Sequence, residues 1–362
     1  MNKLIFRNSF YNLTILCAMV QLLVQSAPCK GLAAAAPSRV AVLGATGRLG
    51  SQTVREFLDR EIPVRCLVRP SSVEKLPEEF TKSPLFEVVT GDILAESSRS
   101  AEGVFDDDTV APSTELVKCL EGCGGVVACY GATRITKFAD LFSNPEDTDP
   151  THAKQINYRT MIALVVACKA VNLKAGKDDT KIGHIVRITG KGEEPTSFFT
   201  VLLNGLGSFA KAWNYQGEVF LRTSLAEDDS IGYTIVRPGI MKEVDGTDAT
   251  SKKDKEPQMT FENDDLVLAD DGGNDLKVTP VAYSQMANLL VTLIVSAENG
   301  SISSEQNNDK VTLASMNPSE ANGASDGKSL VDKIVALQND RCVEILRFFL
   351  WPSLLPTISL IV

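Results

Sequence analysis

Short runs of β-branched residues alternate with stretches at helical spacing between residues 39 and 316. Such alternation is typical of a parallel sheet covered by helices on both faces. We therefore predict an α/β fold of the Rossmann type, with a doubly wound parallel sheet. Residues 161–171 are apolar nearly all round, which predicts a covered helix. The expected strands are 39–43, 64–68, 86–90, 125–129, 184–189, 233–236 and 311–314, and the other expected helices include 51–60 and 217–224.

Residues 242–280 change character, because Asp, Lys, Thr and Gly replace the apolar runs. We interpret this segment as a polar excursion that contains a hairpin, with a turn near residues 270–274. The residues that a cofactor site would need all precede the excursion. It is therefore expected to form a small C-terminal, substrate-side lobe beyond the ends of the strands.

Residues 1–27 follow the order of a secretory signal, with Lys3 and Arg7 before an apolar stretch and small residues after it. The apolar stretch is too short to span a bilayer comfortably. Residues 28–38 are expected to be a short, Ala-rich linker. The leader predicts entry into the secretory pathway, or into a plastid by a two-step route, with mitochondrial import as the alternative.

Residues 317–362 are expected to form a polar linker followed by an apolar tail. The tail, residues 343–362, is nearly all apolar, so one interpretation is peripheral contact with a membrane. Pro352 and Pro356 would interrupt a spanning helix. Packing on the folded body, or a poorly ordered tail, is the alternative interpretation.

Charge and composition narrow the classes of function. The chain of 362 residues carries 36 basic and 46 acidic side chains, a net charge of -10. Most of such a surface repels phosphate, so no nucleic-acid partner is expected, whereas an anionic cofactor needs only a few local donors. The sequence has two histidines and eight cysteines, of which Cys119 and Cys123 lie close together. We expect buried thiols and no metal site.

The segment VAVLGATGRLG, residues 40–50, places three glycines between a predicted strand and a predicted helix. Glycines at this spacing permit a tight turn and a close approach of the backbone to a pyrophosphate, and the helix offers unpaired N–H groups. The segment therefore predicts a nucleotide-binding loop. Its expected cofactor contacts are Gly44, Thr46, Gly47, Arg48, Leu49 and Gly50.

The second predicted strand ends in LVRPSS, which contains no acidic residue. An NAD-specific site usually places an acid there on the ribose, whereas Arg69 and Ser71 can hold a 2′-phosphate. NADP(H) is therefore favoured over NAD(H), the alternative being that Arg69 is a solvated surface residue. Asp92, after the third strand, is interpreted as an adenine contact or a helix cap. The contacts expected after the fourth strand are Gly131, Ala132 and Thr133.

Several motifs in this order resemble the NmrA-like, NAD(P)H-binding group of atypical short-chain dehydrogenase/reductases. The resemblance covers residues 39–316, and its most specific parts are GATGRLG, INYRTMIALVVACKA, HIVRITGKG, GEVFLRTS and YTIVRPG. It implies a Rossmann fold that binds a nicotinamide dinucleotide. The stretch LLNGLGSFAKAWNYQGEVFLRTS is also similar to plant and algal members that are associated with organelle assembly.

The same resemblance assigns the loop of Thr189 and Lys191 to the nicotinamide, which makes both residues catalytic candidates. Tyr215 is a further candidate proton donor, with a packed or hydrogen-bonded structural role as the alternative. Reductases of this superfamily commonly use Tyr-x-x-x-Lys, in which the lysine lowers the pKa of the tyrosine, yet no tyrosine here has a lysine four residues later. His152 and His184 are further acid/base candidates, each with a structural role as the alternative. Two hypotheses follow. The chain is an NADPH-dependent oxidoreductase that transfers hydride to an unidentified small organic acceptor, or a non-catalytic scaffold or redox-sensing assembly protein that binds the dinucleotide.

Overall fold

The computed structural model describes residues 38–95, 110–135, 149–191, 209–243, 265–270, 272, 276–319, 323 and 326–340. The chain divides into two units, residues 1–37 and residues 38–362, and every described residue belongs to the second unit. The predicted leader and most of the predicted linker, as well as the apolar tail of residues 343–362, lie outside the described residues.

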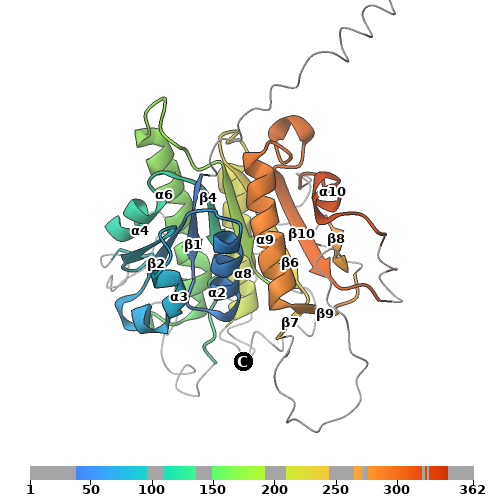
Figure 1. The fold of residues 1–362 in the computed structure, drawn as a ribbon, viewed down its shortest axis with the longest axis horizontal. Coiled ribbons are helices and arrows are strands. Elements are labelled where there is room, and N and C mark those ends of the chain that lie inside the picture. The colour runs from blue at the N-terminus through green and yellow to red at the C-terminus, as the bar shows by residue number, and fades with distance from the viewer. Residues whose placement is uncertain are drawn as a thin grey trace, which may run out of the picture. The chain divides into compact units, whose positions relative to one another are not determined.

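An eight-stranded sheet forms the centre of the fold, with the strand order β3-β2-β1-β4-β5-β6-β10-β8 (Figure 1). Neighbouring strands are parallel, except that β8 runs antiparallel to β10. The winding reverses between β1 and β4, which confirms the doubly wound Rossmann-type sheet and locates its switch point. The strands are β1 Arg39–Leu43, β2 Val64–Val68, β3 Phe86–Thr90, β4 Cys123–Ala128, β5 His184–Ile188, β6 Gly232–Pro238, β8 Val267–Ala269 and β10 Lys310–Met316.

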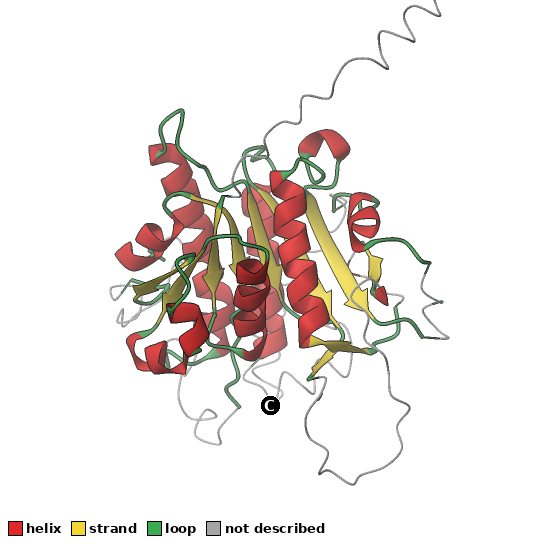
Figure 2. Ribbon diagram, in the orientation of Figure 1, coloured by secondary structure: helices red, strands yellow, loops and turns green. Residues whose placement is uncertain are grey.

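Helices cover both faces of the sheet, as Figure 2 shows. Alternate strand residues face opposite layers, so that Val40 and Val42 pack with α2 and α9 while Ala41 and Leu43 pack with α4, α6 and α8. The two hydrophobic cores therefore lie one on each side of the sheet. The main helices are α2 Arg48–Asp59, α4 Thr114–Leu120, α6 Thr160–Lys174, α8 Ala210–Leu225 and α9 Tyr283–Glu298. Shorter elements are η1 Pro70–Lys75, α3 Glu78–Thr81, the π-helix η5 Lys154–Arg159, and η8 Ser304–Gln306.

The covered helix that the sequence predicts at residues 161–171 is confirmed as the centre of α6. Nine of its residues are buried, among them Met161, Leu164 and Val171. By length and composition alone, the apolar run Lys154–Lys174 could cross a membrane, but 61% of its most apolar window is buried inside the fold. This stretch is accordingly a core element of the α/β body.

Much of the excursion of residues 242–280, including most of the expected turn near 270–274, lies outside the described residues. Two short strands at its ends, β7 Ile240–Lys242 and β9 Pro280–Ala282, pair with each other in parallel. The strand β8, within the excursion, pairs antiparallel with β10, with Leu268 opposite Ser315. Apolar residues of the excursion thus extend the main sheet, because the edge of β10 offers unpaired backbone groups.

The folded body continues beyond residue 316, where the sequence analysis ended it. A short helix, α10 Leu330–Val335, is capped by Ser329, whose hydroxyl accepts a hydrogen bond from the backbone N–H of Asp332. Leu330 and Ile334 are buried in the same core as α9. The expected linker therefore contains a packed element, which the sequence analysis missed because α10 is only six residues long.

Candidate cofactor-binding site

The predicted glycine loop connects β1 to α2 at the switch point of the sheet. Gly44 has a φ of +89°, a conformation that glycine adopts without strain, and the N–H of Gly47 donates to the Gly44 carbonyl at 3.0 Å. A Cβ atom on Gly50 would lie 2.1 Å from that same carbonyl oxygen. The loop is therefore a tight backbone cradle, and a side chain at Gly44 or Gly50 would collide with neighbouring backbone atoms.

The start of α2 leaves its amides available to a ligand. Its N-cap residue is Gly47, so no side chain caps the first turn, and the unpaired N–H groups and positive end of the helix favour an anion. The backbone geometry thus fits the diphosphate of a dinucleotide, which Arg48 and Leu49 would hold through their N–H groups.

A cavity of about 950 Å³ opens above this loop, at the carboxyl ends of the strands. Ten of the twelve predicted cofactor contacts line it. They are Gly44, Thr46, Gly47, Arg48, Leu49, Arg69, Asp92, Gly131, Ala132 and Thr133. Of the other two, Gly50 packs beneath the loop against Gly44. Ser71 is exposed and does not line the cavity, whereas the neighbouring Ser72 does.

Asp92 is positioned by its local backbone. Its carboxylate accepts a hydrogen bond from the N–H of Ile93 at 2.7 Å, and its carbonyl accepts one from the hydroxyl of Ser113. Ser113, not Asp92, caps α4 by accepting from the N–H of Leu116. The helix-cap alternative for Asp92 stays untested, because residues 96–109 lie outside the described residues, and Asp92 itself lines the cavity.

Several lining residues had no signal in the sequence analysis. Tyr283 begins α9, far along the chain, and the guanidinium of Arg48 lies 5.3 Å from the centre of its ring. Met241, from β7, joins them at the cavity wall. Tyr130 precedes the predicted Gly131 contact and also lines the cavity. Only the pairing of β7 and the start of α9 bring the first two to the glycine loop, so a local pattern does not reveal them.

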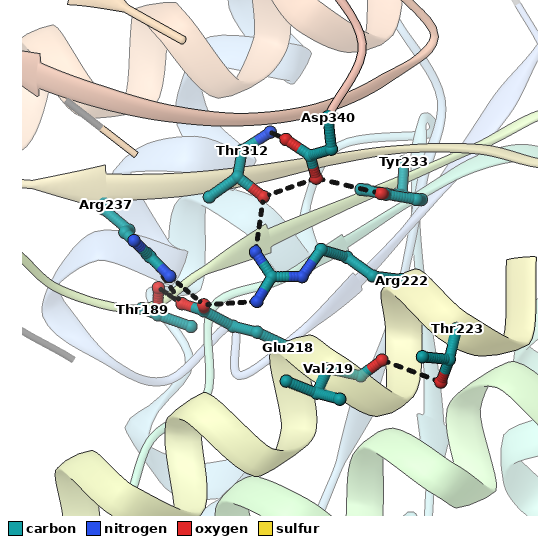
Figure 3. A network of polar contacts seen from close by, with 9 residues as sticks. All are labelled: Thr189, Glu218, Val219, Arg222, Thr223, Tyr233, Arg237, Thr312 and Asp340. Atoms are coloured by element: carbon teal, nitrogen blue, oxygen red, sulfur yellow. Dashed lines mark hydrogen bonds and ion pairs between the residues drawn. The ribbon is translucent and has the colours of Figure 1, made fainter. Parts of the chain in front are cut away.

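The candidate Thr189 is engaged in a buried polar network, shown in Figure 3. Its hydroxyl donates to the carboxylate of Glu218 at 2.6 Å, and Arg237 donates to the same carboxylate at 2.6 and 3.2 Å. Burial raises the pKa of Glu218, but Arg237, Arg222 and Thr189 outweigh burial and hold that pKa below its ordinary value. Because Glu218 is ionised and accepts its proton, Thr189 can offer a ligand a lone pair but not a hydrogen-bond donor in this arrangement.

The other two catalytic candidates lie away from the cavity lining. The ammonium of Lys191 donates to the carbonyl of Gly272 at 3.1 Å. The ring centre of Tyr215 lies 5.8 Å from the guanidinium of Arg222. Neither residue lines the 950 Å³ cavity that holds the predicted cofactor contacts. The structure therefore brings the predicted cofactor residues together without adding the predicted catalytic residues to them.

Both histidines are buried. The Nε2 atom of His184 lies 2.9 Å from the hydroxyl of Thr234, and burial lowers the pKa of His184 to about 4. The Nδ1 atom of His152 accepts a hydrogen bond from the N–H of Lys154 at 3.2 Å. These contacts favour the structural alternative for both side chains.

The buried thiols expected from the sequence are confirmed for four of the five described cysteines, and Cys129 is half-buried. Burial raises the pKa of each, to about 11 for Cys123 and about 12 for Cys129. Over the described ranges, no group of three or more His, Cys, Asp or Glu side chains gathers to hold a metal ion. The thiols act here as small apolar side chains.

The glycine cradle, the switch point and the cavity define a dinucleotide-binding protein of the Rossmann class. The chain belongs to the NAD(P)H-binding family, whose model matches residues 44–266. This agrees with the resemblance to the NmrA-like group of atypical short-chain dehydrogenase/reductases.

Curated relatives of the chain include chloroplast proteins. The chain is similar to protein TIC 62 of Oryza sativa, with 27% identity over 208 residues, which are 56% of this chain and 35% of the relative. It is 29% identical over 208 residues to the chloroplastic protein At2g34460 of Arabidopsis thaliana, covering 56% of this chain and 59% of that one. The chain therefore matches less than two thirds of each relative.

Among solved structures, a putative NAD-dependent epimerase/dehydratase from Bacillus halodurans superposes with a TM-score of 0.50. The superposition covers 83% of this chain and 100% of that chain, at 12% sequence identity. At this identity the likeness concerns the fold alone, and it agrees with the doubly wound sheet.

Proposed function

We propose that this chain binds NADP(H) and works in a plastid as an oxidoreductase that transfers hydride to a small organic acceptor. The observation that carries the cofactor preference is Arg69. It directly follows β2 and lines the cavity together with Ser72, and the segment LVRPSS has no acid. A guanidinium at this position attracts a 2′-phosphate, whereas a ribose hydroxyl is usually bound by a carboxylate.

The chemistry of this proposal rests with the cofactor. The dinucleotide would supply the hydride, and the chain would orient it through the glycine loop and the strand ends. Thr189, Lys191 and Tyr215 stay candidates for assisting the acceptor. Since the hydroxyl of Thr189 donates to Glu218, its role in this proposal is to orient the acceptor rather than to protonate it.

The cofactor preference is tested by Arg69→Gln. Losing a charged hydrogen-bond partner of the 2′-phosphate should weaken NADPH binding by about 1 to 3 kcal/mol, roughly 5- to 150-fold in Kd, with little change for NADH. Arg55→Gln is the matched control, because Arg55 is an exposed arginine on α2 that pairs with Glu79 and does not line the cavity. Calorimetric titration of both variants with NADPH and with NADH gives the four dissociation constants. Equal losses for NADPH and NADH would overturn the NADP assignment.

The second candidate function is a non-catalytic scaffold or redox-sensing assembly protein that uses the dinucleotide as a ligand. It is favoured by the absence of Tyr-x-x-x-Lys and by the engagement of Thr189 with Glu218. NADPH oxidation against a panel of quinones, flavins and enones separates the two functions. Tight binding without turnover would favour the scaffold, and turnover would favour the oxidoreductase.

The plastid part of the proposal draws on the leader and on the chloroplastic relatives. Fusing residues 1–38 to a fluorescent protein and imaging it in algal or plant cells tests the leader directly. Plastid fluorescence is the expected result. Secretion or mitochondrial fluorescence would replace this compartment with one of the alternatives.

A further inference from the structure

Asn157 connects the cavity wall to the start of α8. Its side-chain oxygen accepts a hydrogen bond from the N–H of Ala132 at 2.9 Å, and its side-chain nitrogen donates to the carbonyl of Ala210 at 3.2 Å. Ala132 lies in the turn of residues 129–133, which lines the cavity, and Ala210 is the first residue of α8. One buried amide thus holds both segments.

Arg187 makes a second connection between the same two segments. From near the carboxyl end of β5, its guanidinium donates to the carbonyl of Tyr130 at 2.7 Å and to the side-chain oxygen of Asn214 at 3.3 Å. The guanidinium also lies 4.3 Å from the centre of the Tyr130 ring. Arg187 is 2% exposed, and no carboxylate among the described residues pairs with it. A buried charge of this kind depends on its hydrogen-bond acceptors.

The elements η5 and α8, which carry Asn157 and its partner Ala210, are packed too closely to slide independently. A Cβ atom on Gly217 of α8 would lie 2.6 Å from the carbonyl oxygen of Asn157. Asn157 belongs to the π-helix η5, a geometry that is often found at functional sites. At the next residue, the ring of Tyr158 lies beside that of Trp213, with centroids 5.7 Å apart and an angle of 31° between the planes. Trp213 is in the first turn of α8, so its surroundings report the position of that turn.

A shift of the turn 129–133 must therefore either break buried hydrogen bonds or move the start of α8. Leaving buried donors and acceptors unpaired is costly, so concerted movement is the favoured response. Asn157 bonds the turn at Ala132 and Arg187 bonds it at Tyr130, so the turn is tied to α8 at two separate residues.

We propose that Asn157 and Arg187 are positioning residues that couple the cofactor-binding turn to the first turn of α8. Dinucleotide binding then shifts that first turn. The coupling rests on the proposed function, because the ligand at the turn 129–133 is the dinucleotide. The start of α8 then responds to the cofactor although it does not line the cavity.

The test uses Trp213 as the reporter. The sequence has two tryptophans, so the full chain with Trp351→Phe leaves Trp213 as the only one. This protein is titrated with NADP⁺, which does not absorb the tryptophan emission, while calorimetry records binding under the same conditions. A saturable change in Trp213 fluorescence that follows the calorimetric isotherm is expected.

Asn157→Asp removes one of the two hydrogen bonds that the Asn157 side chain makes. A carboxylate still accepts from Ala132 but cannot donate to the carbonyl of Ala210. At saturating NADP⁺, the fluorescence change should fall to less than half of its original amplitude, and Arg187→Lys should reduce it in the same direction. Asn172→Asp is the matched control, because Asn172 of α6 also joins backbone groups, with both of its bonds to Ile182 at 2.8 Å. This control should keep the full amplitude.

The outcomes separate the coupling from the proposed function. Absence of binding heat with both NADP⁺ and NAD⁺ before any bridge substitution would sink the proposed function, and the coupling with it. Binding heat without a Trp213 response, or an equal response in Asn157→Asp, would overturn the coupling alone. An equal loss of amplitude in Asn157→Asp and Asn172→Asp would show general destabilisation and also overturn it.

Discussion

Glu218 of α8 holds Arg237 of β6 through two hydrogen bonds in a setting where neither side chain reaches solvent, being 0% and 4% exposed. The pair fixes α8 against the sheet at the point where Thr189 also meets the same carboxylate. A buried ion pair of this kind adds little to stability compared with an apolar pair. Removing one partner, however, leaves the other charge buried without a counter-charge.

Glu218→Gln should therefore lower the free energy of unfolding by about 3 kcal/mol, because Arg237 and Arg222 lose their carboxylate. Urea unfolding at neutral pH measures the change. Glu79→Gln is the comparison, since it breaks the exposed Arg55–Glu79 pair and should cost less than about 1 kcal/mol. Similar losses for the two variants would contradict the role assigned to the buried pair.

Gly50→Ala should abolish or strongly weaken dinucleotide binding, by at least about tenfold. Alanine normally stabilises a helix relative to glycine by about 1 kcal/mol, but here its Cβ atom would lie 2.1 Å from the Gly44 carbonyl and the loop must shift. Gly183→Ala serves as the control, because its Cβ atom would meet nothing nearer than 3.8 Å. Titration with NADPH measures the Kd of each variant, and a circular dichroism spectrum shows whether the variant is folded. An unchanged Kd in folded Gly50→Ala would be incompatible with the cradle.

His184 predicts a specific pH dependence of stability. Burial lowers its pKa to about 4, whereas in an unfolded chain a histidine has a pKa of about 6.5. The unfolded state therefore binds more protons between these values, so stability is complete above about pH 6.5 and falls as the pH drops toward 4. At pH 5.5 the loss should be roughly 1 kcal/mol relative to pH 7.5.

His184→Gln should remove this component, because glutamine does not titrate and can still hydrogen bond to Thr234. Urea midpoints of both proteins at pH 7.5 and 5.5 give the comparison. The idea fails if the variant loses as much stability as the parent over this interval.

Cys129 should be unreactive although it lines the cavity. Its pKa is raised to about 12 by burial, and the thiolate is the reactive form. At pH 7.5, carbamidomethylation by iodoacetamide should be at least about a hundredfold slower in the native protein than in urea, as followed by peptide mass spectrometry. Rapid native labelling of Cys129 would show that the thiol is accessible and ionised.

The sequence was sufficient to predict the sheet and the glycine loop, because both depend on local patterns. Buried strands are continuous apolar runs, such as 39–43, and the spacing of Gly44, Gly47 and Gly50 follows directly from what a tight turn needs. The end of β2 could be predicted in the same way. These residues lie within a few positions of a strand end, so chain order alone places them at one edge of the sheet.

The polar interior under α8 was not predictable by the same reasoning. Asn214, Glu218 and Arg222 recur every four residues and face inward, so the buried side of α8 looks like a solvent-facing one. The expected helical residues 217–224 are therefore only the C-terminal half of α8, which begins at Ala210. Arginines inside otherwise apolar strands, at Arg187 and Arg237, are the signal that could have revealed the network.

The buried network also ends far from where it begins along the chain. Asp340 accepts hydrogen bonds from Tyr233 at 2.9 Å and from the hydroxyl and N–H of Thr312 at 2.8 and 2.7 Å, and Thr312 accepts from Arg222 at 3.3 Å. During synthesis, α8 and β6 emerge from the ribosome about a hundred residues before this partner. A nascent chain that stops short of residue 340 leaves the hydroxyls of Tyr233 and Thr312 without this acceptor. The network is thus complete only in a full-length chain. Truncated copies should therefore be the ones that chaperones bind and proteases degrade.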